Sequence, residues 1–139
     1  MRNVPNACIN TVSYPNIRFE ENKRVIYFHN SQGAVYHRVQ VDGCAITNGA
    51  RCDNLLASSD AHSEYFVELK GIDVKHAIEQ LEASIVAIGQ YEDNRHAYVV
   101  STNVAPALST AVQLKKKEFK KKFKAELVVK EKRIDVQLN

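Results

Sequence analysis

An apolar segment, an amphipathic repeat and a second apolar segment follow one another in the middle of this chain. The first, EYFVELKG at 64–71, and the third, HAYVVST at 96–102, have the β-rich composition of buried strands. Between them, Asp73 can cap a helix that runs from about 74 to 89 and ends near Gly89. Its apolar residues at helical spacing are Val74, Ala77, Ile78, Leu81, Ile85 and Ile88. A strand, a helix and a strand in this order usually form a parallel pair with a right-handed crossover, which predicts an α/β fold.

The first half of the chain predicts an antiparallel meander. RVIYFHN (24–30) and AVYHRVQV (34–41) are β-rich segments on either side of a Ser-Gln-Gly turn at 31–33, which indicates a hairpin. The Asn-Gly pair at 48–49 is a strong hairpin signal between CAIT and the run that begins CDNLLAS. The SSDAHS turn at 58–63 then leads into EYFVELKG.

The second half predicts a basic helix and a closing hairpin. Pro106 fits the start of a helix that covers about 107–124 and contains the run KKKEFKKKFK. LVVKEKRIDVQL, at 127–138, reads as a tight hairpin that turns near residues 130–132. The predicted order is strands, helix, strand, helix and strands, in one domain spanning 1–139 with a mixed central sheet.

The composition is that of an ordinary globular domain. The chain has 139 residues, of which 45% are hydrophobic and 25% charged, and this argues against disorder and a membrane class. No apolar run approaches the roughly 18 to 20 residues that span a bilayer, and the polar N-terminus lacks a signal-peptide pattern. We therefore expect a cytoplasmic protein.

The three cysteines predict buried free thiols. Cys8, Cys44 and Cys52 are odd in number and lack CxxC or paired Cys/His spacing. Neither a disulfide framework nor a zinc site is expected from this pattern.

Charged residues interrupt the apolar run EYFVELKG. As a strand, it places Glu68 and Lys70 on one face, where buried ionised groups need a partner or a ligand. Asp53 stands at the start of NLLAS, which should pair with this strand, so the two acids lie on neighbouring strands. Carboxylates suit a hard cation such as Mg²⁺, and an ammonium beside it suits stabilisation of a phosphate under attack. The pattern therefore predicts a site for phosphodiester hydrolysis.

These residues resemble the PD-(D/E)XK phosphodiesterases, which include restriction endonucleases, Holliday-junction resolvases and RecB-type nucleases. The similarity covers about residues 25 to 102, including the strand at 96–102. The matching motif residues are Cys52, Asp53, Glu68, Leu69, Lys70 and Gln80. Two positions depart from the pattern, since Cys52 takes the place of the family's proline and Ser84 that of a tyrosine in RecB-type enzymes.

The resemblance implies a restriction-endonuclease-like fold, in which a mixed central sheet is flanked by helices. It implies that Asp53 and Glu68 hold a magnesium or manganese ion. It also implies that Lys70 positions or activates the attacking water and that Gln80 lies near the site. Such a protein would be an endonuclease or resolvase acting on nucleic acid, DNA rather than RNA, and small members of this family usually work as homodimers.

Each candidate also has a plainer explanation. Glu68 and Lys70 can form an ion pair on a half-exposed strand, and Asp53 can end a turn by accepting hydrogen bonds from backbone amides. Asp42 is a rival acid, and Gln80 can be an ordinary helix residue. The protein can then be a non-catalytic module that binds nucleic acid or protein in a degenerate nuclease fold. A third possibility is an unrelated interaction module in which Glu68 and Lys70 are exposed and Asp53 lies far from them.

The basic helix is the candidate nucleic-acid interface. From Ala107 onward, ten Lys and Arg residues stand against four Asp and Glu residues, within a chain of net charge +3. Phe119 and Phe123 would anchor the helix and leave a cationic face that neutralises phosphates with little sequence preference. A solvated helix face is the plainer explanation, and two phenylalanines are a small apolar face for membrane binding. The candidate contact residues are Lys115, Lys116, Lys117, Lys120, Lys121, Lys122 and Lys124.

Overall fold

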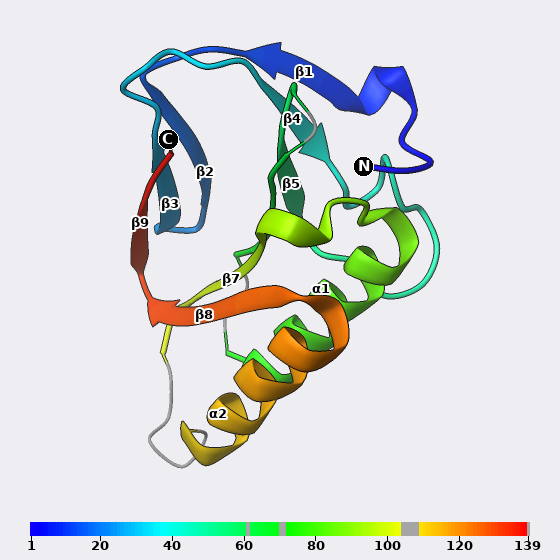
Figure 1. The fold of residues 1–139 in the computed structure, drawn as a ribbon. Helices are drawn as coiled ribbons and strands as arrows, with labels where there is room; N and C mark the ends of the chain where they lie inside the picture. The colour runs from blue at the N-terminus through cyan, green and yellow to red at the C-terminus, as the bar shows by residue number, and fades with distance from the viewer. Residues whose placement is uncertain (61, 70–71, 104–108, 139) are drawn as a thin grey trace.

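The computed structural model describes residues 1–60, 62–69, 72–103 and 109–138, which form a six-stranded sheet, a three-stranded sheet and two α-helices (Figure 1). The large sheet contains, in spatial order, β1 (Ile9–Val12), β4 (Tyr36–Gln40), β5 (Asn54–Ser58), β6 (Glu64–Glu68), β7 (Arg95–Ser101) and β8 (Ala125–Glu131). The small sheet contains β2 (Asn16–Glu21), β3 (Arg24–His29) and β9 (Arg133–Gln137). The helices are α1 (Val74–Ile88) and α2 (Ser109–Glu118), with shorter helical segments η1 (Asn6–Cys8), η2 (Glu92–Asn94) and η4 (Phe119–Phe123).

The large sheet is mixed, as the sequence predicts. β1, β4, β5 and β6 pair antiparallel, whereas β6, β7 and β8 pair parallel. In the chain, α1 lies between β6 and β7, and α2 lies between β7 and β8. The predicted unit of strand, helix and parallel strand is confirmed, and the fold is mixed α/β.

The helix α1 begins where the sequence predicts. The side chain of Asp73 accepts a hydrogen bond from the backbone N–H of His76 at 3.0 Å, which caps the first turn. The helix ends before Gly89, whose backbone N–H donates to the carbonyl of Ile85 at 2.9 Å. Its buried apolar face consists of Val74, Ala77, Ile78, Leu81, Ile85 and Ile88. The apolar repeat therefore gives both the helix and its orientation toward the core.

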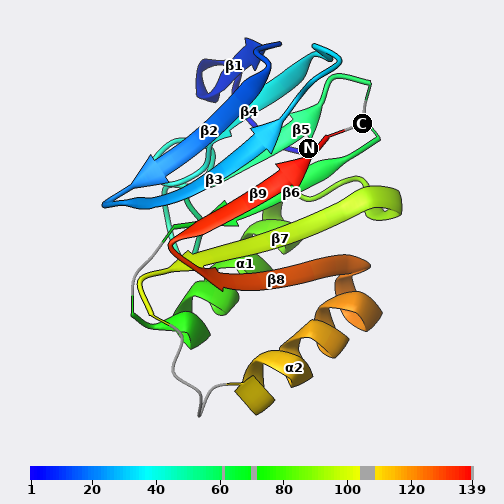
Figure 2. The ribbon, with the colours of Figure 1, turned by 90° about the vertical axis from the view of Figure 1, so that its left-hand side faces the viewer.

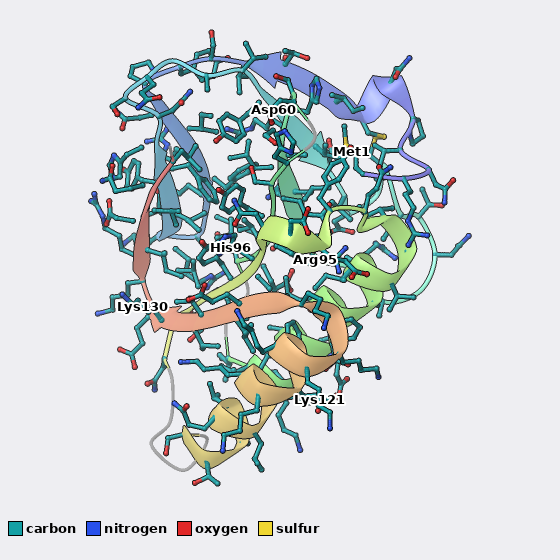
Figure 3. The ribbon with its side chains drawn as sticks, viewed as in Figure 1. Met1, Asp60, Arg95, His96, Lys121 and Lys130 are labelled. Atoms are coloured by element: carbon teal, nitrogen blue, oxygen red, sulfur yellow. A yellow bond between two sulfur atoms is a disulfide. The ribbon has the colours of Figure 1, made fainter. Side chains whose placement is uncertain are left out.

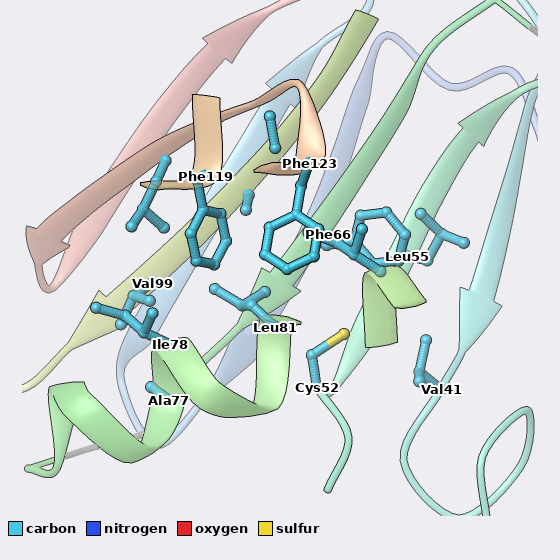
Figure 4. Close-up of a cluster of buried hydrophobic side chains, with 14 of the residues drawn as sticks. Val41, Cys52, Leu55, Phe66, Ala77, Ile78, Leu81, Val99, Phe119 and Phe123 are labelled. Carbon is cyan, nitrogen blue, oxygen red and sulfur yellow. The ribbon is translucent and has the colours of Figure 1, made fainter. Parts of the chain in front are cut away.

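Two apolar cores lie on opposite faces of the large sheet. On one face the helices cover a cluster that includes Phe66, Leu81 and Phe119 (Figure 4). The small sheet lies over the other face (Figures 1 and 2). Between the two sheets is a second cluster, which includes Phe28 and Tyr65. Both helices of the described residues lie on one face of the central sheet, and the small sheet covers the other face. The mixed central sheet is confirmed, whereas a restriction-endonuclease-like arrangement of helices around it stays a prediction.

The apolar alternation in β2 and β3 explains the second sheet. Ile17 and Phe19 on β2, and Ile26 and Phe28 on β3, are all buried on the face that meets the large sheet. A pair of strands with one apolar face needs a surface to cover that face. The apolar face of the β2–β3 pair, extended by β9, packs against the large sheet.

Two turns predicted in the first half do not form the expected hairpins. β3 and β4, on either side of residues 31–33, belong to different sheets. β3 pairs instead with β2, through a turn at Asn22 and Lys23, both of which have positive φ. The Asn-Gly pair at 48–49 lies in the long loop between β4 and β5, and residues 44–47 form no strand. The antiparallel pairing of β5 with β6 is confirmed.

The basic helix and the closing strands form with different partners from those expected. The predicted start of the basic helix at Pro106 lies outside the described residues. The helical segment ends at Phe123, before Lys124, which has a φ of 55°. β8 and β9 turn at Lys132, but β8 pairs with β7 and β9 pairs with β3, so they are not a hairpin. Leu127 is buried in the helix-side core and Ile134 in the other, which explains why the chain changes sheets.

Two of the cysteines are joined, contrary to the expectation of free thiols. Cys8 and Cys44 form a disulfide with a Cα–Cα distance of 5.7 Å, and Cys52 is free and buried. The antiparallel pairing of β1 with β4 brings η1 and the loop after β4 together, a proximity that cysteine spacing alone does not reveal. Within the described ranges, no helix is long and apolar enough to cross a membrane.

Candidate functional site

The register of β5 and β6 brings Asp53 and Glu68 to adjacent positions. Asn54 lies opposite Val67, so residues 53 and 68 are next to each other in the ladder. The backbone N–H of Asp53 donates to the carbonyl of Val67 at 3.2 Å, and Asp53 Oδ2 accepts from the backbone N–H of Leu69 at 2.8 Å. The two predicted carboxylates therefore lie on neighbouring strands at the same end of the sheet.

Glu68 is fully buried, with 0% of its surface exposed. It shares one side of β6 with Phe66, which lies in the core under the helices, whereas Tyr65 and Val67 face the second core. A buried acid beside another acid is costly unless a cation or hydrogen bonds offset the charge. The alternative in which Glu68 is exposed and remote from Asp53 is wrong.

Cys52 lies close to both carboxylates. Burial raises the pKa of its thiol to about 12, with smaller contributions from the charges of Glu68 and Asp53 and an opposing hydrogen bond with Ser84. The backbone N–H of Cys52 donates to Ser84 Oγ of α1 at 2.7 Å. This contact connects α1 to the chain just before β5, and it gives Ser84 a structural role at the position where RecB-type enzymes have a tyrosine.

Gln80 lies on α1 one turn before Ser84 and therefore on the same side of the helix. It is 9% exposed, and its Oε1 has no hydrogen-bond partner in the part of the chain that the structure describes. Such a buried acceptor is uncommon in folded proteins. Carboxylate oxygens such as those of Asp53 and Glu68 are ligands that Mg²⁺ and Mn²⁺ prefer, so the chemistry of these two residues fits the predicted metal.

The other predicted members of the site fall elsewhere. Lys70 lies outside the described residues. Asp42, the rival acid, lies in the loop after β4 and pairs at the surface with Arg51, at 2.7 Å between Nε and Oδ1. Among residues 1–60, 62–69, 72–103 and 109–138, no three His, Cys, Asp or Glu side chains form a metal-binding group. A metal between Asp53 and Glu68 would take its further ligands from water and phosphate, as Mg²⁺ commonly does.

Arg24 of the small sheet reaches this end of the large sheet, which the sequence analysis missed. Its Nε donates to the carbonyl of Leu69 at 2.7 Å, and its Nη1 donates to Thr102 Oγ1 at 2.8 Å. The peptide groups of Leu69 are thus held by Asp53 at the N–H and by Arg24 at the carbonyl. No sequence signal pointed to Arg24, because its strand was expected to belong to the same sheet as β4.

A buried ion pair at the opposite end of β6 was also missed. Glu64 is fully buried and accepts from Arg95 Nε at 2.7 Å, and Arg95 Nη1 donates to the carbonyl of Phe123 at 2.7 Å. Arg95 is labelled in Figure 3. The sequence did carry a signal for this site, because Glu64, Phe66 and Glu68 alternate along the strand and therefore share one face. This pair joins β6, β7 and η4, and is a structural contact away from Asp53.

The candidate nucleic-acid lysines differ in their exposure. Lys115 pairs with Glu82 at 3.0 Å and Glu118 at 3.5 Å, and the hydrogen bond with Glu82 raises its pKa. Lys116 is half-buried. The exposed members are Lys117, Lys120, Lys121, Lys122 and Lys124. The exposed set, which includes Lys121 in Figure 3, is the part that can meet an anionic partner.

The exposed lysines of η4 lie toward the end of the sheet away from Glu68. Glu68 pairs with Val99, whereas Ala125, directly after this basic segment, pairs with Arg95. Four residues of strand separate these two levels, which corresponds to about 13 Å. A partner that contacts both the acids and the lysines must therefore be extended.

Comparison with protein-family models, with curated proteins and with solved structures finds no match to this chain.

Proposed function

We propose that this protein is a metal-dependent phosphodiesterase of the PD-(D/E)XK kind that cleaves nucleic acid. The observation that carries the proposal is the adjacency of Asp53 and Glu68 on β5 and β6, with Glu68 fully buried. Two carboxylates brought together in a buried place repel each other and lose hydration. A divalent cation held between them would offset both costs.

The topology supports the same proposal. β4, β5 and β6 form an antiparallel meander, α1 follows, and β7 returns parallel to β6. This is the element order that the resemblance implies for a restriction-endonuclease-like core. The small sheet is an addition that covers the face opposite the helices.

The roles of the residues follow from their positions. Asp53 and Glu68 would hold Mg²⁺ or Mn²⁺ through carboxylate oxygens, and Gln80 Oε1 would accept a hydrogen bond from a water in the site. When bound, the ion supplies activation of water and stabilisation of charge on the phosphate. Lys70 would position the water that attacks phosphorus, after which the P–O bond breaks and the leaving oxygen takes up a proton.

The proposed substrate is DNA held partly by the basic helix. Exposed lysines of α2 and η4 would neutralise backbone phosphates, which gives salt-dependent binding without base recognition. The distance between these lysines and the acids suits a substrate that extends along the sheet. A homodimer, with one site for each strand, and a cytoplasmic location belong to the same proposal.

The test is cleavage of labelled duplex, branched and single-stranded DNA by the purified protein with Mg²⁺, Mn²⁺ or EDTA. Asp53→Asn keeps an oxygen that can accept from the Leu69 N–H, so the variant should fold. It should lower the metal-dependent cleavage rate about a hundredfold or more. Asp42→Asn is the matched control, because it removes one carboxylate from a surface ion pair outside the site.

Two outcomes would oppose the proposal. Cleavage that survives Asp53→Asn would place the chemistry elsewhere or in a contaminant. Binding of DNA without cleavage under any metal condition would favour the non-catalytic module with a degenerate nuclease fold.

A further inference from the structure

Arg38 on β4 differs from the other arginines in its surroundings. Every other arginine of the chain donates to a backbone carbonyl or pairs with a carboxylate, namely Arg2, Arg18, Arg24, Arg51, Arg95 and Arg133. The guanidinium of Arg38 lies over the ring of Phe19, with Cζ 4.1 Å from its centroid. Within the described part of the chain it has no hydrogen bond or ion pair.

This guanidinium is half-buried as well as unneutralised. Burial lowers the pKa of Arg38, and the nearby charge of Arg18 lowers it further, whereas Tyr14 opposes both effects. A cation that has lost part of its hydration without gaining an anion is unfavourable. An anionic ligand at this position would remove the cost.

Arg38 lines two neighbouring clefts. The first has a volume of about 400 Å³ and is lined by Tyr14, Asn16, Arg18 and Tyr27 in addition to Arg38. The second also has a volume of about 400 Å³, and its lining includes Asn10, Gln40 and Asn54. The two clefts adjoin each other at the side chain of Arg38, which lines both. Arg38 of β4 contacts Phe19 of β2, and the small sheet lies over this part of the large sheet (Figure 2). We call the two clefts together the Arg38 groove.

The lining of the Arg38 groove combines cations with aromatic rings. Tyr14 is 53% exposed and offers a ring face to a ligand. Arg18 is only loosely paired with Glu20, at 3.6 Å between two exposed side chains. Guanidinium groups bind phosphate, and exposed aromatic rings stack with nucleobases.

We propose that the Arg38 groove binds a single-stranded segment of nucleic acid, with phosphates on Arg38 and Arg18 and a base stacked on Tyr14. A duplex hides its base faces from a tyrosine, whereas a single strand exposes them. The combined volume of the two clefts is larger than one nucleotide fills. This favours a single-stranded segment over a free mononucleotide as the ligand. The single-stranded nucleic acid would lie on the face of the protein away from the helices. This inference rests on the proposed nucleic-acid function.

The test is fluorescence anisotropy of a labelled oligothymidylate with the full chain in EDTA, so that no cleavage occurs. Arg38→Gln keeps the aliphatic stem and should weaken binding about tenfold. Tyr14→Ala should also weaken binding about tenfold, through loss of stacking. Arg51→Gln is the control, because it removes the same charge from a surface ion pair outside the groove, and it should change affinity less than about twofold.

Three further probes separate the possible ligands. The same sequence as a duplex should bind independently of Tyr14, and neither a free mononucleotide nor a glutamate-rich peptide should displace the oligonucleotide at comparable concentration. The proposal is overturned if all three variants weaken binding equally, if Tyr14→Ala has no effect, or if the peptide competes as well as the oligonucleotide. Tyr14 is exposed, so its variant tests the groove even if Arg38→Gln misfolds.

Measuring DNA binding and DNA cleavage with the same set of variants distinguishes this inference from the nuclease proposal. Binding that depends on Arg38 together with cleavage that ignores Asp53→Asn would sustain the groove and reject the active site. Cleavage that depends on Asp53 together with binding that ignores Arg38 and Tyr14 would do the reverse.

Discussion

At the scale of single residues, the peptide groups of Leu69 connect the two sheets to the candidate site. Asp53 accepts from the Leu69 N–H and Arg24 donates to the Leu69 carbonyl, so the chain is fixed immediately after Glu68. A charged donor to a partly buried carbonyl is stronger than a neutral one. The carboxylate of Asp53 is thereby oriented by the same segment that carries Glu68.

Replacing Arg24 should cost stability as well as order at the site. Arg24→Ala removes the bonds to Leu69 and Thr102, and we expect a loss of about 1.5 to 2 kcal/mol in the free energy of unfolding. Urea denaturation followed by circular dichroism measures it. Arg18→Ala is the control, because its ion pair is exposed and should contribute below about 0.5 kcal/mol. Equal effects of the two variants would refute the role assigned to Arg24.

At the scale of elements, the strands β6 and β7 are joined by a stack of rings on the side of the second core. The rings of Tyr65 and His96 lie 4.9 Å apart at 11°, and those of His96 and Tyr98 lie 6.2 Å apart at 7°. Burial lowers the pKa of His96, while Glu126 opposes the shift and Lys120 adds to it. The folded protein therefore favours neutral His96.

The depressed pKa of His96 predicts a loss of stability in acid. Above the unfolded value of about 6.5, both states hold a neutral imidazole. As the pH falls below that value the unfolded state binds the proton more readily, so stability declines until the folded pKa is passed. In urea titrations, wild type should lose up to about 1 kcal/mol more than His96→Gln between about pH 7 and pH 5. Parallel pH profiles for the two proteins would contradict this.

The elements with local signals were the predictable ones. The apolar repeat and the Asp73 cap predicted α1, and the expected antiparallel pairing predicted that Asp53 and Glu68 lie on neighbouring strands. The register that makes them adjacent came from the structure. The distribution of strands between two sheets was not predictable in this way. Alternation shows that Ile26 and Phe28 share a face, but it does not say which strand lies beside them, because that depends on contacts distant in the sequence.

At the scale of the whole molecule, one disulfide ties the N-terminal segment to the loop that precedes the site. Cys8 and Cys44 are separated by 36 residues, and Cys44 lies in the loop that leads to Asp53. The odd number of cysteines and their irregular spacing predicted free thiols, because spacing in the sequence does not show which cysteines are close in space. Such bonds are more common in oxidising compartments than in the cytoplasm, so a disulfide that forms in the cell would count against the proposed cytoplasmic location.

Removing the disulfide should destabilise the fold. The double variant Cys8→Ser with Cys44→Ser frees the unfolded chain, and we expect a loss of about 2 to 4 kcal/mol in the free energy of unfolding. Denaturant titration measures this loss. Thiol counting in denaturant without reductant should find only Cys52 in the wild type. Detection of three thiols in freshly purified, air-oxidised protein would show that the bond does not form.

The central claim is that Asp53 and Glu68 are metal ligands, and calorimetric titration of Mn²⁺ into the wild-type protein tests it most directly. We expect one Mn²⁺ per chain, binding about tenfold to a hundredfold more weakly in Asp53→Asn and in Glu68→Gln, but unchanged in the Asp42→Asn control. Folded variants are verified by circular dichroism. Absence of Mn²⁺ binding by the wild type, or binding that Asp53→Asn and Glu68→Gln leave unchanged, would contradict the account.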